Sequence, residues 1–172
     1  MIIITGQEGA GKTTIVPALL PYVQPGAAFD AEDLGQVNPW HWDDAFKNLL
    51  WDNVAALVRN FWQAGYATVI AGSFLNEYAD YVQFRPRLEG DAGIYLVQLC
   101  ASKSVRDQRR IARSKPSSQE WRDELDRWYP EDTTLRDAAA GYEYVPIDTS
   151  SLSVAQTVDQ IRRVLPEVFR PE

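Results

Sequence analysis

Residues 2–14 read IIITGQEGAGKTT and carry the most specific pattern in the chain. The first four residues form a short apolar run that predicts a buried strand. The loop that follows has the form G-x-x-x-x-G-K-[ST] over residues 6–13. A helical pattern then covers residues 12–20 and ends at Pro21 and the Pro25-Gly26 turn. The motif therefore stands between a strand and a helix, the context on which its chemistry depends.

The loop has the composition of a phosphate cradle. Its glycines let backbone N–H groups turn inward around phosphate oxygens, and the helix N-terminus adds positive potential. We expect Lys12 to reach the transferable phosphate of ATP and the Thr13 hydroxyl to ligate Mg²⁺. The residues expected to bind the nucleotide are Gly6, Gln7, Glu8, Gly9, Ala10, Gly11, Lys12, Thr13 and Thr14. The alternative is a glycine-rich turn in which the Lys-Thr pair occurs by chance.

Apolar runs of strand length alternate with helical segments through the rest of the chain. Further strands are expected at residues 27–30, 66–71, 93–99 and 144–147, a long helix at 43–63, and a last helix that runs from a capping box at Ser153 through residue 165. Near-continuous apolar strands are typical of a parallel sheet covered on both faces. The expected fold class is α/β, with a three-layer, five-stranded parallel sheet of the P-loop NTPase type in a single domain over residues 1–172.

Composition excludes several classes of protein. Hydrophobic residues make up 45% and charged residues 24% of the 172 residues, which fits a folded domain and excludes a disordered or fibrous chain. The net charge of −7 argues against nucleic acid or an anionic membrane surface as a partner. One cysteine and one histidine exclude a disulfide framework and a zinc site built from these residues. Since we find no signal peptide and no apolar run of ~20 residues, we expect a cytoplasmic protein, with its oligomeric state left open.

The phosphate loop, the short length and the order of the later segments resemble the small P-loop kinases of the nucleotide-kinase-like fold. Relatives in this group include gluconate kinase, shikimate kinase and antibiotic-phosphorylating or resistance proteins. The similarity covers most of the chain, and the phosphate loop is its specific motif.

In those families an acidic residue at the end of the second strand faces the γ-phosphate, and here FDAEDL occupies residues 29–34. The resemblance implies Asp30 as the first choice of general base and Asp33 as the second. The alternative is that one or more of these acids caps the following segment, and which of Asp30, Glu32 and Asp33 is the base stays open. The carboxylate that many P-loop proteins carry after a later strand is missing here, because Gly72 and Ser73 follow residues 66–71.

Basic residues are concentrated between residues 103 and 115. They are Lys103, Arg106, Arg109, Arg110, Arg113 and Lys115. The R-x-x-x-R spacing of Arg109 and Arg113 resembles the lid of nucleotide-kinase-like enzymes, whose arginines close on the transferring phosphoryl group. The resemblance implies a basic lid over about residues 103–130, with catalytic roles for Arg109 and Arg113 and with Arg106 or Arg110 over the adenine. A solvated basic helix face is the alternative.

The resemblance implies that residues 23–80 build the acceptor side, and this segment contains eight acidic and two basic residues. An anionic acceptor would need arginines there, so we expect a small neutral or cationic molecule that carries a hydroxyl group. Trp40 and Trp42 either stack on this acceptor or pack their loop onto the sheet. The basic lid and Asp30 favour an ATP-dependent phosphotransferase. An NTP hydrolase or nucleotide-binding module without a small acceptor, and a nucleotide kinase that uses Arg85 and Arg87, stay open as alternatives.

Overall fold

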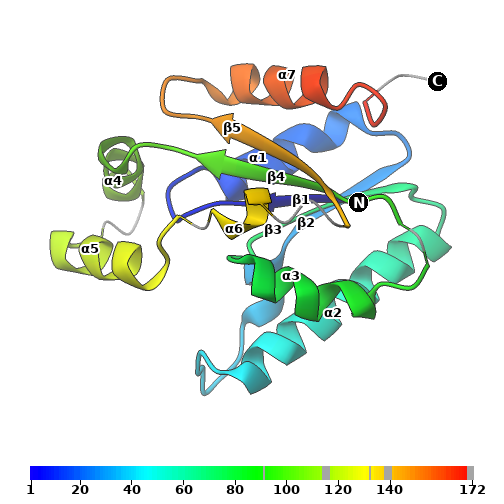
Figure 1. Ribbon diagram of the computed structural model, residues 1–172, viewed down its shortest axis with the longest axis horizontal. Coiled ribbons are helices and arrows are strands. Elements are labelled where there is room, and N and C mark those ends of the chain that lie inside the picture. The colour runs from blue at the N-terminus through cyan, green and yellow to red at the C-terminus, as the bar shows by residue number, and fades with distance from the viewer. Residues whose placement is uncertain (91, 114–116, 132, 138–140, 170–172) are drawn as a thin grey trace.

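The computed structural model describes residues 1–90, 92–113, 117–131, 133–137 and 141–169. Five strands form one parallel sheet in the order β2-β3-β1-β4-β5. They are β1 (Ile2–Thr5), β2 (Gly26–Asp30), β3 (Thr68–Gly72), β4 (Tyr95–Cys100) and β5 (Glu143–Asp148). Figure 1 shows the strands running toward the end of the sheet where α4 (Lys103–Ile111) and α5 (Gln119–Trp128) lie. The expected α/β fold class is confirmed.

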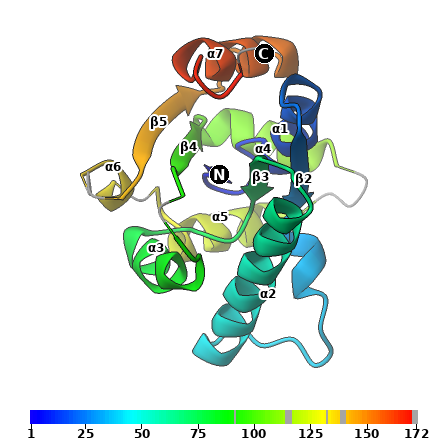
Figure 2. The same ribbon diagram turned by 90° about the vertical axis from the view of Figure 1, so that its right-hand side faces the viewer.

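Helices cover both faces of the sheet and make three layers (Figure 2). On one face lie α1 (Lys12–Leu19) and α7 (Val154–Val164), and on the other lie α2 (Asp44–Gln63) and α3 (Tyr78–Phe84). Side chains alternate across a strand, so Ile2 and Ile4 pack with α1 and α7 whereas Ile3 packs with α2. All three isoleucines have no exposed surface, which explains why β1 reads as a continuous apolar run.

Expected and observed boundaries differ by small shifts that have local causes. The strand expected at residues 66–71 begins at Thr68, because the N–H group of Tyr66 still donates to the Phe61 carbonyl at 3.0 Å and closes α2. The strand expected at residues 93–99 begins at Tyr95, since the Gly93 carbonyl accepts a hydrogen bond from the N-terminal ammonium at 2.7 Å.

Polar caps fix the starts of the two main amphipathic helices, as the sequence predicts. The Asp43 carboxylate accepts a hydrogen bond from the Phe46 N–H group at 2.8 Å at the start of α2. Ser153 and Gln156 form the expected capping box at the start of α7. None of the helices in the described ranges has the length and apolar character to cross a membrane.

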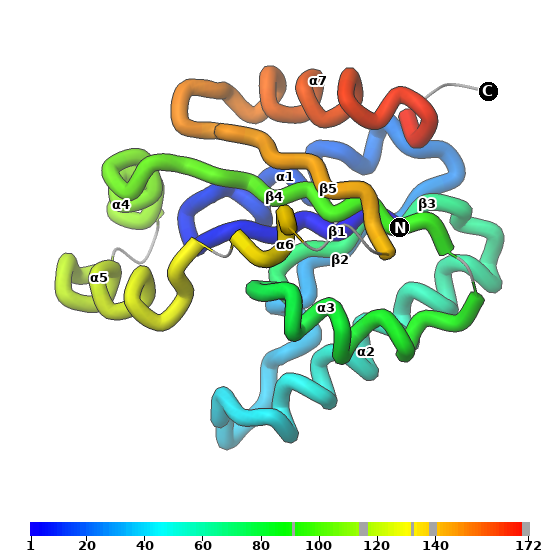
Figure 3. Tube along the Cα trace, viewed as in Figure 1, coloured from blue at the N-terminus to red at the C-terminus, as the bar shows by residue number. Residues whose placement is uncertain are grey.

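The loop between β1 and α1 and the helices α4 and α5 share one end of the sheet (Figure 3). Short helices that the sequence analysis did not predict complete the fold: 3-10 turns at Leu20–Tyr22, Ala31–Gly35 and Arg85–Arg87, and α6 at Thr134–Asp137. Lys115, one of the expected lid residues, lies outside the described residues. The functional side chains therefore gather at the carboxyl end of a parallel sheet, where α/β folds bind their ligands.

Candidate functional site

The backbone of the glycine-rich loop packs closely against β4 and α4. A Cβ atom at Gly6, whose φ is 133°, would lie 2.2 Å from the Leu99 carbonyl oxygen in β4. A Cβ atom at Gly9 would lie 2.9 Å from the Arg106 carbonyl oxygen in α4. Only glycine fits such approaches and the left-handed φ at Gly6, so the loop conformation depends on these two residues.

The Lys12 side chain folds back onto the phosphate loop. Its ammonium donates to the carbonyl oxygens of Gly6 at 2.7 Å and Gln7 at 3.3 Å. Burial lowers the pKa of Lys12, while the charges of Glu32, Asp30 and Glu8 oppose that change. The ammonium is therefore fixed at the position where the motif requires a cation next to phosphate oxygens.

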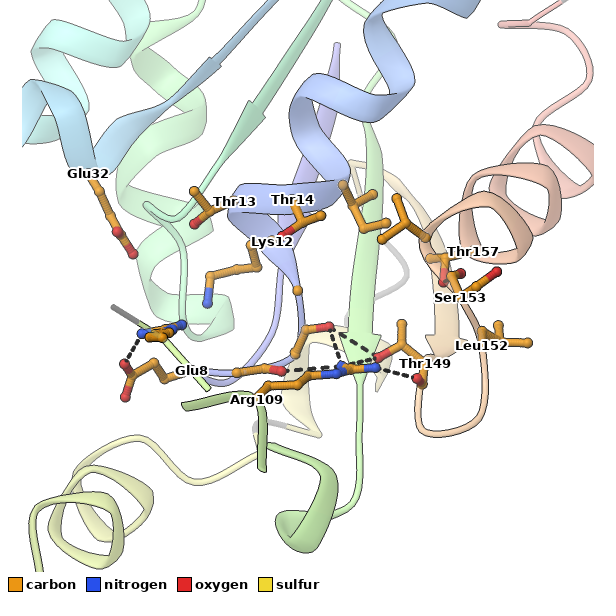
Figure 4. A pocket seen from close by; sticks show the side chains of 16 residues that line it. Glu8, Lys12, Thr13, Thr14, Glu32, Arg109, Thr149, Leu152, Ser153 and Thr157 are labelled. Atoms are coloured by element: carbon orange, nitrogen blue, oxygen red, sulfur yellow. Dashed lines mark hydrogen bonds and ion pairs between the residues drawn. The ribbon is translucent and has the colours of Figure 1, made fainter. Parts of the chain in front are cut away.

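A cleft of about 600 Å³ extends from the loop toward the start of α7. Its far end is lined by Thr149, Leu152, Ser153, Val154 and Thr157. Figure 4 shows Lys12 and Glu32 at one end of this pocket and Thr149, Leu152 and Thr157 at the other. We refer to this space as the nucleotide cleft. Its volume suits a nucleotide, and a nucleotide with its phosphates at the loop would place its base at the α7 end.

The two arginines of the R-x-x-x-R pair both line the nucleotide cleft, and they make different contacts. The Arg109 guanidinium donates to the carbonyl oxygens of Gly9 and Ala10 at 3.2 Å and to the Thr149 carbonyl at 2.7 Å. Arg113 instead pairs with the Glu8 carboxylate at 2.6 Å. Arg109 thus bridges the phosphate loop and Thr149 at the far end of the cleft, whereas Arg113 pairs with Glu8 in the loop.

Arg106 and Arg110 do not cover the adenine end, which corrects that part of the expectation. Their residues are 5% and 1% exposed, and their guanidinium groups pair with Asp126 of α5 at 2.6 and 2.8 Å. Arg110 also pairs with Asp107 at 3.3 Å and approaches Glu8 at 3.5 Å. These charges join α4, α5 and the phosphate loop, because α5 presents its acids to the basic face of α4.

Three smaller cavities share the Trp42 side chain, and we call them the acceptor-side cavities because they lie in the part of the fold expected to receive the acceptor. The central cavity, about 220 Å³, is lined by Lys12, Glu32, Ser73, Trp42 and Tyr129 together with Gly6, Gln7, Glu8, Asn76, Arg110, Leu125 and Asp126. The apolar cavity, about 380 Å³, includes Trp40, Trp42, Phe46 and Leu50. The acidic cavity, about 340 Å³, includes Glu77, Asp80, Glu131, Trp42, Trp128 and Tyr129. Trp42 lines all three and packs at right angles to Tyr129, with ring centroids 6.1 Å apart.

The acids after β2 occupy different places. An Asp30 oxygen accepts a hydrogen bond from the Glu32 N–H group at 3.1 Å and so caps the following 3-10 turn. Asp33 is exposed and lines neither the nucleotide cleft nor the three acceptor-side cavities. Glu32, which the sequence left open as a base or a capping residue together with Asp30 and Asp33, lines the cleft, the central cavity and the apolar cavity.

The fold implies Mg²⁺, and the donor set fits an ion that arrives with the nucleotide. Among the described residues there is no group of three or more His, Cys, Asp or Glu that could hold a metal by itself. Thr13 lines the nucleotide cleft at the first turn of α1, where its hydroxyl would hold the ion. At the end of β3, the buried Ser73 hydroxyl has no hydrogen-bond partner among the described residues and offers a further oxygen beside Lys12. Oxygen donors of this kind are those that Mg²⁺ prefers.

Sequence reasoning did not find several residues of the acceptor side. Tyr129 and Asp126 belong to the segment that follows the basic helix, and their side chains reach the central cavity only because α5 folds back over the phosphate loop. One contact of that return is a hydrogen bond from the Gln7 amide to the Tyr129 carbonyl at 3.0 Å. No local motif in the sequence indicates this contact.

No protein-family model and no curated protein sequence matches the chain. Solved structures do match. A gluconokinase from Sinorhizobium meliloti superposes with a TM-score of 0.72 at 15% identity, over 98% of this chain and 92% of that one. A sugar kinase from a Janibacter species gives 0.70 at 15% identity, over 99% and 98%. A tunicamycin resistance protein from Deinococcus radiodurans gives 0.60 at 20% identity, over 99% and 98%. At such identities the likeness establishes the fold, and the chain has the P-loop kinase-like fold of these structures.

Proposed function

We propose that the protein is an ATP-dependent phosphotransferase that moves the γ-phosphoryl group to a hydroxyl of a small neutral or cationic molecule. One observation carries the proposal: Glu8, Lys12 and Glu32 line both the nucleotide cleft and the central cavity. A γ-phosphate held at Lys12 would therefore face a second space large enough for part of an acceptor. The kinases among the structures of the same fold support phosphoryl transfer as the chemistry.

The chain's own residues account for the parts that phosphoryl transfer needs. Lys12 stabilises the charge that develops on the phosphate oxygens, and the loop glycines give backbone N–H groups access to them. Arg113 stands at the phosphate end of the cleft, where its guanidinium can pair with phosphate oxygens. Mg²⁺, when bound at Thr13, supplies positive charge that offsets the charge of the phosphates.

Charge on the acceptor side supports a neutral or cationic acceptor. The basic side chains that line the three acceptor-side cavities are Lys12, Arg110 and Lys47. Arg110 pairs with Asp126 at 2.8 Å, and Lys47 lies 3.9 Å from Asp80. Lys12 is thus the one lining cation in the described chain without an ion pair, and the γ-phosphate needs it. An acceptor phosphate would find no free partner there.

The acidic cavity adds groups that suit a cationic portion of the acceptor. Glu77, Asp80 and Glu131 share it with three aromatic side chains. The Lys47 ammonium of the chain itself lies 5.7 Å from the centre of the Trp42 ring, which is a cation–π distance. An ammonium group on an acceptor would meet the same kind of surroundings.

Arg85 and Arg87, which a nucleotide kinase could use to bind an acceptor phosphate, form contacts elsewhere in the protein. Arg85 donates to the carbonyl oxygens of Leu88 and Gly90, and Arg87 pairs with Asp52 at 2.7 Å. Neither residue lines the nucleotide cleft or the three acceptor-side cavities. This arrangement favours the small-molecule phosphotransferase over the nucleotide kinase.

A screen of hydroxyl compounds tests the proposal. The protein is incubated with ATP, Mg²⁺ and aminoglycosides, aminocyclitols, nucleosides, sugars, polyols or nucleoside monophosphates, and mass spectrometry detects the gain of one phosphoryl group. We expect products from the neutral or cationic compounds with wild type and none with Lys12→Ala, which controls for contaminating kinases. Free phosphate as the only product in every reaction would indicate a hydrolase. Products from the monophosphates alone would indicate a nucleotide kinase.

A further inference from the structure

We propose that Glu32 takes the proton from the acceptor hydroxyl and that Asp30 is the residue that positions it. The inference rests on the proposed phosphotransferase function and names the base within it. It replaces the choice of Asp30 or Asp33 as the base, because the three acids after β2 differ in what their side chains can reach.

Glu32 stands where the two substrates would meet. Of the three residues shared by the nucleotide cleft and the central cavity, Lys12 is a cation. Glu8 is engaged with Arg113 at 2.6 Å and with Arg110 at 3.5 Å. Glu32 is the remaining carboxylate, and it forms no ion pair with any described residue. A general base must lie within reach of the reacting hydroxyl, and Glu32 meets this requirement on geometry alone.

Asp30 holds the backbone from which Glu32 projects. It ends β2, where it lies in register with Gly72 of β3, and one of its oxygens accepts the Glu32 N–H group at 3.1 Å. Its side chain does not line the nucleotide cleft or the central cavity. Its other oxygen is buried and has no hydrogen-bond partner in the described parts of the chain. Asp30 therefore fixes the turn and contributes negative charge behind Glu32.

The surroundings make Glu32 a stronger base than a free carboxylate. Desolvation within the cleft raises the pKa of Glu32, the neighbouring charges of Asp30 and Glu8 raise it further, and Lys12 and Arg113 oppose the rise. Arg110, Asp126 and Tyr129 face the same central cavity from α4 and the end of α5. A carboxylate with a raised pKa accepts a proton more readily than a carboxylate in water does.

The step balances with ATP as the co-substrate. The proton of the acceptor O–H group passes to the Glu32 carboxylate as the acceptor oxygen forms a bond to the γ-phosphorus. The bond from the γ-phosphorus to the β–γ bridging oxygen breaks, and its electron pair leaves on ADP, whose charge Lys12 offsets. Glu32 then releases the proton to water, and the products are ADP and the phosphorylated acceptor.

The experiment compares wild type with Glu32→Gln, Asp30→Asn and Asp33→Asn. Binding of a fluorescent ATP analogue and the melting temperature are measured for each. ADP formation is followed across the acidic and neutral pH range with the neutral or cationic compound of the screen that gives the highest rate. If no compound raises the rate above that of ATP hydrolysis by water, the hydrolysis rate is followed instead. Glu32→Gln should lower kcat by ~10²- to 10⁴-fold with nucleotide affinity nearly unchanged. It should also abolish the acidic limb of the pH profile, which is the fall of kcat at low pH as the base becomes protonated.

The matched variants distinguish a residue that positions the base from the residue that accepts the proton. Asp30→Asn should move the acidic limb to lower pH, because a negative neighbour of Glu32 is lost, and should lower kcat less than Glu32→Gln does. Asp33→Asn, on a residue that lines neither the nucleotide cleft nor the central cavity, should match wild type, and Glu32→Asp should keep an acidic limb.

Two results would overturn the inference. Loss of the acidic limb in Asp30→Asn but not in Glu32→Gln would make Asp30 the base and leave the phosphotransferase function intact. A wild type that binds the nucleotide yet forms no ADP with any compound or with water would overturn the proposed function, and the role of Glu32 with it.

Discussion

Asp126→Asn probes the ion pairs that hold α5 against α4 and the phosphate loop. The Asp126 side chain is 14% exposed and accepts hydrogen bonds from Arg106 at 2.6 Å and Arg110 at 2.8 Å. Both arginines are almost fully buried, so the substitution leaves their charges without the main counterion. Breaking a buried pair costs about 3 to 5 kcal/mol, and we expect the lower end because Asp107 still pairs with Arg110 at 3.3 Å.

Thermal and urea unfolding measure this cost. A loss of about 3 kcal/mol lowers Tm by about 6 to 12 °C in a chain of this size. The matched control is Asp159→Asn, which removes an exposed ion pair with Arg162 at 3.5 Å on α7 and should change the free energy of unfolding by less than about 0.5 kcal/mol. If Asp126→Asn and this control had the same Tm and the same free energy of unfolding, the result would refute the idea that the buried charges hold α5 in place.

The same pair gives a pH dependence with a definite sign. Desolvation raises the pKa of Asp126, but the hydrogen bonds and charges of Arg106 and Arg110 outweigh it, so the pKa is lowered on folding. The carboxylate therefore contributes stability above its unfolded pKa of about 3.9 and loses it as pH falls through the lower folded pKa. Acid titration of Tm should show this loss in wild type, and Asp126→Asn should lack that portion of it.

Three further predictions concern the site. Lys12→Ala should lower phosphoryl transfer by about 10³-fold or more with little change in Tm, and near-normal turnover would exclude the role of the loop lysine. Arg109→Ala should weaken ATP binding in calorimetry more than it lowers kcat, whereas Arg113→Ala should do the reverse; identical profiles would contradict their separate placement. Trp42→Ala should raise the KM of the acceptor but not of ATP, with the exposed Trp121→Ala as control, and equal effects would remove Trp42 from the acceptor site.

The fold followed from local sequence signals because each signal has a local cause. The glycines of the phosphate loop are required by close backbone approaches, and the apolar run of β1 reflects burial on both faces of the sheet. The Asp43 and Ser153 caps satisfy N–H groups within one turn. Such features can be predicted without knowledge of the tertiary structure.

The site was less predictable because its residues depend on distant packing. The sequence predicts that Arg106 and Arg110 bind phosphate or face solvent. Both are instead buried in ion pairs with Asp126, which lies sixteen residues beyond Arg110. The choice among the acids after β2 depended on a turn in which Asp30 bonds to the backbone of Glu32. Spacing along the chain cannot reveal which of two neighbouring carboxylates turns toward Lys12.

A paired comparison of acceptors tests whether the protein phosphorylates neutral or cationic hydroxyl compounds in preference to phosphorylated ones. Nucleosides and aminoglycosides are assayed beside the matching nucleoside monophosphates, with ATP and Mg²⁺ in excess, and kcat/KM is measured for each. Since the acceptor-side cavities offer no free cation besides Lys12 in the described chain, the neutral or cationic compounds should exceed any monophosphate by well over tenfold, a ratio that needs only ~1.4 kcal/mol. Faster phosphorylation of the monophosphates would contradict the proposed acceptor class and indicate a nucleotide kinase.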